Sequence, residues 1–346
     1  MLAKGFKIVD KKRFEVYVES IQCKENEAII KIDTAAVCKA DLRYYLGKRD
    51  KRILGLKYPI NLLHEAVGIV VRDKSGKFQA GDRVALCPNI VTKEEREKHL
   101  VCTMTGLGDN YCPTAKFASS NINGFSRDYI SFPISNLIKL PGHIPFEIGV
   151  FSEILSVAQA AIRRVHIADE TKIAIWGDGI LGYAIYSVLS ETKNCHLTVI
   201  GHNKSKLEMF KEAKPYTTEE FEQVKADIDI AFECVGGQGS ESAINQIIDT
   251  VNPGAKIILT GVSEENIAIN TRKVLEKGLA FYGVTRSNVE DFKTVVALFN
   301  RKSYQEKVEK LVLSENPINN IKDFYDVFER EAINRKLGKH IMKFRF

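Results

Sequence analysis

Residues 172–182 are Lys-Ile-Ala-Ile-Trp-Gly-Asp-Gly-Ile-Leu-Gly, and this stretch decides the fold. It begins with a short apolar run typical of a buried strand, continues with the spacing G-x-G-x-x-G and leads into an apolar helical pattern that extends to Leu189. Glycines at these places let the backbone approach a pyrophosphate at the positive end of the helix dipole. The pattern therefore predicts a dinucleotide-binding turn, and a glycine-rich turn that binds nothing is the alternative. The predicted turn consists of Gly177, Asp178, Gly179, Ile180, Leu181 and Gly182.

Similar apolar runs follow along the chain at 197–200, 228–232 and 256–260, with helical spacing between them. Strands that alternate with helices predict a parallel, doubly wound α/β sheet. The part before residue 146 differs, because residues 28–37 alternate apolar and polar side chains and short turns separate further strands. With 346 residues, two domains are expected.

The segment that follows the run 197–200 contains no carboxylate. Folds that bind NAD carry Asp or Glu at this place, where it accepts a hydrogen bond from the ribose 2′-hydroxyl. Here Gly201 leaves room, and donors or cations suited to a 2′-phosphate follow it: His202, Asn203, Lys204 and Lys206. We therefore predict NADP(H) rather than NAD(H). The alternative for the two lysines is that they only begin a solvated helix.

The composition excludes several classes of protein. Hydrophobic residues make up 45% and charged residues 27%, which is too apolar for a disordered chain. A net charge of +6 is small for a nucleic-acid-binding protein, and no stretch of 18 uncharged apolar residues could span a membrane. The Lys-rich start has no apolar segment typical of a signal peptide. The seven cysteines, an odd number, therefore indicate reduced thiols in the cytoplasm.

The whole charge excess lies in residues 1–58, with 14 Lys+Arg against 8 Asp+Glu. The basic residues are most closely spaced in residues 39–57, just after the candidate ligand Cys38. This concentration of positive charge predicts an anionic substrate. Arg43 and Arg49 are suited to bind a phosphate through two parallel hydrogen bonds. A solvated basic loop is the alternative, and it is the better interpretation of Lys48, Lys51, Arg52 and Lys57.

Candidate metal ligands lie on both sides of this basic stretch. Cys38 ends the alternating segment, and His64 and Glu65 stand just before the apolar run 66–71. Sulfur, imidazole and carboxylate are ligands of a catalytic zinc that keeps one position open. Taken singly, a buried thiol and a locally bonded His-Glu pair are ordinary alternatives. No C-x2-C pair occurs, so a structural zinc held by four cysteines is not expected.

Several motifs in this order resemble those of the zinc-dependent medium-chain dehydrogenase/reductases. They are Val37-Cys38-Lys39-Ala40-Asp41, Leu63-His64-Glu65-Ala66-Val67-Gly68, Gly81-Asp82-Arg83-Val84 and the glycine turn, and the resemblance extends to Gly338-Lys339. It implies a GroES-like, β-rich catalytic domain at 1–154 and a Rossmann NADP-binding domain at 155–285. It also implies that residues 286–346 return to the catalytic domain.

Longer motifs are similar to those of the ribulose-5-phosphate reductases within that family. They lie at residues 43–50, 176–179, 232–237 and 270–278. This resemblance implies an NADPH-dependent reduction of the C2 ketone of ribulose 5-phosphate to ribitol 5-phosphate, which feeds CDP-ribitol for teichoic acid or capsule. It also implies a homo-oligomer, expected as a dimer, and a ribitol-5-phosphate cytidylyltransferase as a partner.

The resemblance assigns roles to single residues. Cys38 and His64 become zinc ligands, Glu65 a carboxylate that can ligate or swing away, and Glu153 the fourth ligand. Without the resemblance, Glu153 is a first-turn acid that the helix dipole favours. One zinc ion per chain is expected, with no structural zinc. Because Ala40 stands where alcohol dehydrogenases often carry a proton-relay hydroxyl, Tyr44, Glu65 or a water would deliver the proton.

Two other functions remain open. A zinc polyol dehydrogenase that uses NAD, with sorbitol, xylitol or ribitol as substrate, would keep every zinc residue. The missing acid near Gly201 and the basic stretch argue against it. A non-catalytic nucleotide-binding relative is the other alternative, and the presence of all the candidate zinc ligands argues against it.

Overall fold

The computed structural model describes residues 1–103, 107–224 and 227–346, and the chain divides into two compact units. Unit 1 consists of Met1–Ser156 with Ser287–Phe346, and unit 2 is Val157–Arg286. No helix within the described ranges is both long and apolar enough to cross a membrane.

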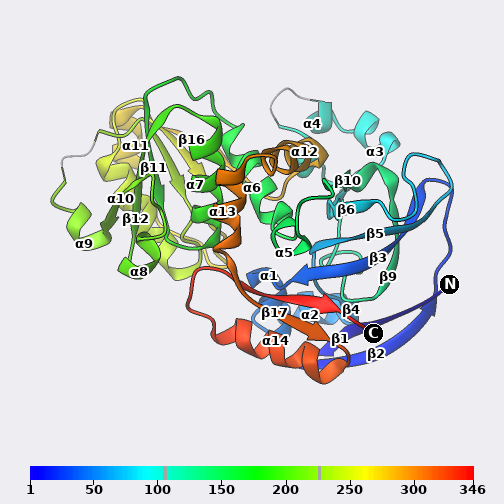
Figure 1. Ribbon diagram of the computed structural model, residues 1–346. Helices are drawn as coiled ribbons and strands as arrows, with labels where there is room; N and C mark the ends of the chain where they lie inside the picture. The colour runs from blue at the N-terminus through cyan, green and yellow to red at the C-terminus, as the bar shows by residue number, and fades with distance from the viewer. Residues whose placement is uncertain (104–106, 225–226) are drawn as a thin grey trace. The chain divides into compact units, whose positions relative to one another are not determined.

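Unit 2 is built on a parallel sheet. Its strand order is β13(Lys214–Thr217), β12(Cys195–Gly201), β11(Thr171–Trp176), β14(Ile230–Glu233), β15(Lys256–Leu259) and β16(Ala280–Gly283). The helices that connect these strands are α7(Ile180–Thr192), α8(Lys204–Leu207), α9(Thr218–Phe221), α10(Ser240–Thr250) and α11(Thr271–Lys277) (Figure 1). The chain starts at the centre of the sheet, runs to one edge and then fills the other half, which is the order of dinucleotide-binding sheets. The predicted parallel, doubly wound sheet is confirmed.

The core of unit 2 explains why the first strand lies at the centre of the sheet. The side chains from Ile173 to Trp176 are all buried, as expected for a strand covered on both faces. Trp176 packs edge-on against Phe221 with ring centroids 5.5 Å apart, and its indole Nε1 donates to Gln246 Oε1 at 2.9 Å. The apolar face of α10 packs into the same core through Ile244 and its neighbours.

Unit 1 contains two larger sheets. One has the order β10(Leu137–Lys139), β6(Arg83–Leu86), β5(Glu65–Asp73), β3(Glu27–Ala36), β18(Lys339–Phe344) and β17(Val312–Ile318), and β9(Tyr129–Pro133) also pairs with β3. The other has the order β2(Arg13–Ser20), β1(Leu2–Asp10) and β4(Ile60–Asn61). The short strands β7(Asn89–Ile90) and β8(Lys116–Phe117) pair separately. Because β18 pairs with β3, the end of the chain lies next to its beginning (Figure 1).

Short helices connect the strands of unit 1. They are α1(Lys39–Tyr45), α2(Lys51–Lys57), α3(Lys93–Lys98), α4(Leu100–Thr103), α5(Phe146–Gly149), α12(Val289–Leu298), α13(Lys302–Glu309) and α14(Ile321–Ile333), and α6(Ser152–Ile162) begins in this unit. An aromatic cluster attaches α14 to the N-terminal strands. The ring of Phe324 lies 4.7 Å from that of Phe6, and the ring of Phe328 lies 4.9 Å from that of Phe14.

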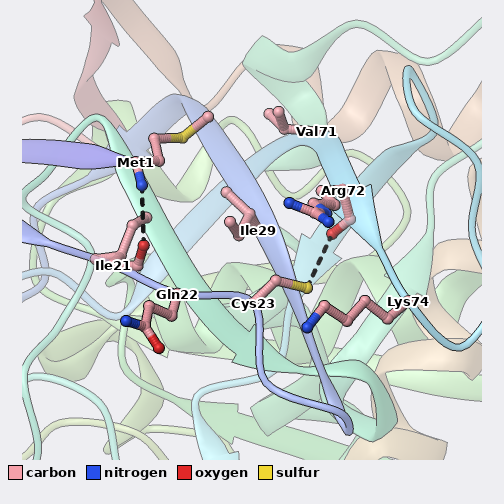
Figure 2. A pocket seen from close by; sticks show the side chains of 8 residues that line it. All are labelled: Met1, Ile21, Gln22, Cys23, Ile29, Val71, Arg72 and Lys74. Carbon is pink, nitrogen blue, oxygen red and sulfur yellow. Dashed lines mark hydrogen bonds between the residues drawn. The ribbon is translucent and has the colours of Figure 1, made fainter.

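A pocket of about 440 Å³ opens in unit 1 beside the first residues of the chain (Figure 2). Its walls include Met1, Ile29 and Val71, and the cations Arg72 and Lys74 also line it. None of the predicted site residues lines it. It is therefore separate from the candidate active site.

Candidate active site

The register of three neighbouring strands brings the predicted metal ligands together. Ala36 at the end of β3 lies opposite Glu65, the first residue of β5, and opposite Ile341 of β18. Cys38 lies two residues beyond Ala36 and therefore reaches the start of β5. For the same reason Lys339, two residues before Ile341, arrives at the same place from the end of the chain.

The ligand atoms of Cys38, His64 and Glu65 lie within 4.8 Å of one another. The described part of the chain contains no other group of three or more such ligands. His64 and Glu65 are buried, and Cys38 is half-buried. Thiolate, imidazole and carboxylate are ligands that zinc accepts.

Glu65 provides an independent test of whether this group fits a metal ion. Its Oε2 is buried, and among the described residues it has no hydrogen-bond partner. A buried carboxylate oxygen without a partner is costly. A cation held by Cys38, His64 and this oxygen would remove that cost. The residues therefore fit a zinc ion.

Asp41 joins the two segments that carry the ligands. Its Oδ2 accepts from the backbone N of Cys38 at 3.0 Å, and its Oδ1 accepts from the backbone N of Leu63 at 3.0 Å and from Ser119 Oγ at 2.5 Å. His64 Nδ1 lies 3.5 Å from the same Oδ1. With Nδ1 directed at a carboxylate, Nε2 of the imidazole is left for a metal.

The charges of Asp41 and His64 stabilise each other. Burial alone would raise the pKa of Asp41, but the neighbouring His64 and the hydrogen bonds from His64, Ser119 and Cys38 hold it below its ordinary value. Burial alone would lower the pKa of His64, but Asp41 and Cys38 raise it well above 6.5. No role was predicted for Asp41. The signal was a helix-capping pattern, in which an acid follows the N-cap residue Cys38 by three positions.

A strained turn sets the direction of His64. The preceding residue, Leu63, has φ +70°, which is uncommon outside glycine. Gly124 packs against this turn so closely that a Cβ would lie 2.3 Å from the Leu63 carbonyl oxygen. The backbone N of Phe125 donates to that oxygen at 2.8 Å, which holds the turn in place.

Lys339 is a second residue whose role was not predicted, although Gly338-Lys339 belongs to the motif set. Its ammonium forms a buried ion pair with Glu65 Oε1. Burial acts to lower the pKa of Lys339, but Glu65 and Cys38 more than offset it, and the pKa is raised. Lys339 therefore neutralises one end of the Glu65 carboxylate and leaves Oε2 for a cation.

Glu153 lies at the start of α6 and is buried. It does not belong to the group within 4.8 Å. Burial, together with the charges of Glu65 and Asp41, raises its pKa to about 7, although His64 and Lys339 oppose the shift. Glu153 thus interacts electrostatically with the group, and its place as fourth ligand stays a prediction.

These shifts predict that the metal-free protein loses stability as the pH rises. The pKa of Glu153 is about 7 in the folded chain, against an ordinary value of 4.5 for an exposed glutamate. The folded chain therefore binds more protons than the unfolded chain between those values, which removes about 3 kcal/mol of stability by pH 7. His64, whose pKa is also raised, acts in the same direction above pH 6.5.

Urea unfolding of chelator-treated protein between pH 4.5 and 8 measures this slope. Glu153→Gln is expected to flatten it below pH 7. An unchanged slope in that variant would show that Glu153 does not titrate as expected.

The residues predicted to bind substrate lie on α1 and directly after it. Arg43 is half-exposed in the last turn of α1, and Tyr44 is buried. The Arg49 guanidinium lies 4.7 Å from the centre of the Tyr44 ring, and the Tyr44 carbonyl accepts from Tyr58 Oη at 2.5 Å. The structure therefore brings Arg49 and Tyr44 together. Their roles, and that of Arg43, stay predictions.

In unit 2, the glycine turn has the geometry that the spacing predicts. Gly177 has φ +125°, and a Cβ there would lie 3.0 Å from the Cys234 backbone. A Cβ on Gly182 would lie 2.1 Å from the Gly177 carbonyl oxygen, so only glycine allows α7 to pack this closely. At Gly179 a Cβ would meet no described atom within 4 Å. The N-terminus of α7, which Gly179 caps, is therefore accessible to a pyrophosphate.

Glu233 was not predicted, and it organises the loops at the same edge of the sheet. Its Oε1 accepts from the backbone N of Val235 at 2.9 Å and of Gly236 at 3.0 Å, and its Oε2 accepts from Gly261 N at 3.0 Å. One buried carboxylate thus holds the loops after β14 and β15. The bond from Gly261 joins residues 28 positions apart and depends on the tertiary fold, so no local pattern indicated it.

At the end of β12, the structure differs from the expectation that Gly201 leaves room. Gly201 does not leave a free space, because a Cβ there would lie 2.6 Å from Asp178 Cβ. Asp178 Oδ2 accepts from the backbone N of His202 at 2.9 Å and of Asn203 at 2.8 Å. The carboxylate that the local sequence lacks therefore comes from the glycine turn.

The side chains predicted to bind a 2′-phosphate already have contacts within the described chain. His202 Nδ1 lies 2.9 Å from Thr218 Oγ1, and Lys204 pairs with Glu220 Oε1 at 2.9 Å. Lys206 Nζ lies 3.8 Å from Asp178 Oδ1. Asn203 Oδ1 accepts from the backbone N of Lys206 and thereby caps α8.

Two family models match the chain. The alcohol dehydrogenase GroES-like domain matches residues 24–142, and the zinc-binding dehydrogenase family matches residues 182–301. Ribulose-5-phosphate reductase 2 of Staphylococcus aureus is 35% identical over 99% of both chains. Ribulose-5-phosphate reductase of Bacillus spizizenii is 33% identical over the same share. The resemblance inferred from the motifs is confirmed.

Solved structures agree with these matches. S. aureus TarJ in complex with NADPH superposes with a TM-score of 0.86 and 30% identity over 100% of both chains. Galactitol-1-phosphate dehydrogenase from Escherichia coli has a TM-score of 0.83 at 20% identity, over 98% of this chain and 99% of that one, which shows the shared fold alone.

Proposed function

The chain belongs to the zinc-dependent medium-chain dehydrogenase/reductases, in the group of the ribulose-5-phosphate reductases, and we propose that it reduces D-ribulose 5-phosphate to D-ribitol 5-phosphate with NADPH. The observation that carries the proposal is the Cys38–His64–Glu65 group in a chain that matches these reductases along its full length. The NADPH in the TarJ structure supports the choice of cofactor. The reaction is a hydride transfer to the C2 ketone.

In this proposal unit 1 is the catalytic domain and holds one zinc ion. Cys38, His64 and the free oxygen of Glu65 supply ligands, and Glu153 is the candidate for a fourth. When bound, zinc acts as a Lewis acid toward the substrate carbonyl. Asp41 fixes the tautomer of His64, and Lys339 holds Glu65 through a buried ion pair.

Proton delivery and cofactor binding are assigned to the chain's own residues. Tyr44 or Glu65, directly or through a water, supplies the proton that completes the alcohol. The glycine turn and the N-terminus of α7 in unit 2 hold the pyrophosphate of NADPH. Lys206 and its neighbours on the β12–α8 turn lie at the ribose end.

The product gives the protein a place in the cell and two expected partners. Ribitol 5-phosphate would feed CDP-ribitol for teichoic acid or capsule. We propose a cytoplasmic enzyme that acts as a dimer and passes its product to a cytidylyltransferase. No structural zinc is expected.

Arg43→Ala is expected to raise the KM for ribulose 5-phosphate by about 30-fold, because it removes a charge-assisted hydrogen bond to the phosphate. The KM for unphosphorylated ribulose should stay within about 2-fold, since that substrate has no phosphate to lose. Steady-state kinetics with both ketoses measure the difference. Lys51→Ala, an exposed cation on α2, is the matched control and should change neither KM. An equal rise in KM for both ketoses would show that Arg43 does not bind the phosphate.

A second candidate is a zinc polyol dehydrogenase that uses NAD. The carboxylate of Asp178 at the end of β12 favours it, because a carboxylate there can accept from a ribose 2′-hydroxyl. Initial rates of NADPH and NADH oxidation with ribulose 5-phosphate separate the two candidates. An equal or better kcat/KM with NADH would overturn the proposed cofactor.

A further inference from the structure

Asp178 reaches from the glycine turn to the end of β12, where sheets of this order bind the adenosine ribose of a dinucleotide. Its Oδ2 accepts from both backbone N–H groups of His202 and Asn203, at 2.9 and 2.8 Å. This approach requires glycine at position 201, since a Cβ there would lie 2.8 Å from the same oxygen. Asp178 therefore positions the β12–α8 turn and brings a negative charge to it.

Lys206 is the cation that faces this charge. Its Nζ lies 3.8 Å from Asp178 Oδ1, and the two side chains are only 22% and 15% exposed. Lys204, two residues earlier, is 73% exposed and pairs with Glu220 instead. A pair shielded from water interacts more strongly than an exposed one. Among the described residues, Lys206 is therefore the cation that pairs with Asp178.

Two backbone donors of the turn are not available to a ligand. Asp178 already binds the N–H groups of residues 202 and 203, so these two cannot bind a 2′-phosphate, and a side-chain cation gains importance for it. The side-chain oxygen of Asn203 accepts from the backbone of Lys206, and the imidazole of His202 lies against Thr218. The ammonium of Lys206 remains as the charge closest to the carboxylate.

We propose that the pair Asp178–Lys206 sets the preference between NADPH and NADH. Asp178 opposes the 2′-phosphate of NADPH and can accept a hydrogen bond from the 2′-hydroxyl of NADH. Lys206 offsets the carboxylate and attracts the phosphate. The preference for NADPH thus depends on one cation, although an acid lies in the same subsite. This inference rests on the proposed nucleotide-dependent reductase function.

Direct binding of NADPH and NADH to the zinc-loaded, full-length chain tests the pair, with Kd measured by calorimetry in the absence of sugar phosphate. Lys206→Met should raise the Kd of NADPH about 30-fold and that of NADH less than about 3-fold. Asp178→Asn keeps the size of the side chain and an oxygen acceptor for the turn. It should raise the Kd of NADH about 5-fold and leave that of NADPH unchanged or lower.

The double variant Asp178→Asn/Lys206→Met separates charge from structure. If Asp178 opposes the phosphate, the double variant should recover about 5-fold of the NADPH affinity that Lys206→Met loses. Lys211→Met, an exposed lysine shortly after α8, is the matched control and should leave both constants within about 3-fold. Adenosine 2′,5′-bisphosphate and AMP should reproduce the pattern of NADPH and NADH.

Three results would overturn the inference. They are an equal loss of NADPH and NADH affinity in Lys206→Met, no recovery in the double variant, and an effect of Lys211→Met as large as that of Lys206→Met. Urea unfolding of each variant checks that it is folded. A chain that binds both nucleotides as expected but does not reduce ribulose 5-phosphate would contradict the proposed substrate and leave this inference standing.

Discussion

Cys38→Ser is expected to lower kcat for ribulose 5-phosphate by about 10³-fold and to leave the purified chain without zinc. The thiolate is the softest donor of the group in unit 1, and a serine hydroxyl stays protonated and binds zinc poorly. Polarisation of the carbonyl by the metal lowers the activation free energy by several kcal/mol, and each 1.36 kcal/mol changes the rate about tenfold. Metal content by mass spectrometry and kcat from NADPH oxidation measure the two effects.

Cys195→Ser is the matched control for this variant. Cys195 is a half-buried thiol at the start of β12 in unit 2, at the opposite end of that strand from Gly201. The control should keep one zinc ion per chain and full activity. If Cys38→Ser also kept its zinc and its kcat, Cys38 would not be a ligand.

Lys339→Met is expected to lower the free energy of unfolding of the metal-free protein by about 3–5 kcal/mol. The substitution removes the only cation that is ion-paired with Glu65 among the described residues and leaves the carboxylate buried without compensation. Breaking a buried ion pair on one side has a cost of this size. Urea unfolding after treatment with a chelator measures it. Zinc should restore part of the stability, because it binds the same carboxylate.

The double variant Lys339→Met/Glu65→Gln tests whether the loss arises from the pair. When Glu65 carries no charge, replacing Lys339 with methionine leaves no buried charge unpaired. The double variant should therefore have a higher free energy of unfolding than Lys339→Met alone. Lys336→Met, an exposed lysine nearby in the sequence, is the control and should change stability by less than about 0.5 kcal/mol. A double variant less stable than either single one would contradict the buried pair.

Local patterns predicted the parallel sheet and the glycine turn, because each depends on a few consecutive residues. The run from Lys172 to Trp176 and the glycines after it identify a strand and a turn wherever they occur. The three candidate ligands in unit 1 were predicted by residue type and by resemblance. Their distances depend on the register between β3 and β5, which no local pattern specifies.

Contacts between distant residues account for what was not predicted. Lys339 and Glu65 are 274 positions apart and meet only because β18 pairs with β3. Asp178 was named as part of the glycine turn, but its contact with the end of β12 depends on how β11 and β12 lie side by side. An apparently missing acid in one strand can therefore be supplied by a neighbouring segment. Glu233 belongs to the same class of tertiary contacts.

The position of the transferred hydrogen tests the central claim most directly. Ribulose 5-phosphate and NADPH that carries deuterium at C4 of the nicotinamide are incubated with the zinc-loaded chain, and the product is examined by NMR. We predict ribitol 5-phosphate with one deuterium at C2, and no labelled product after zinc is removed with a chelator. NADPH oxidation without label at C2, or unchanged labelling in the zinc-free protein, would contradict the account.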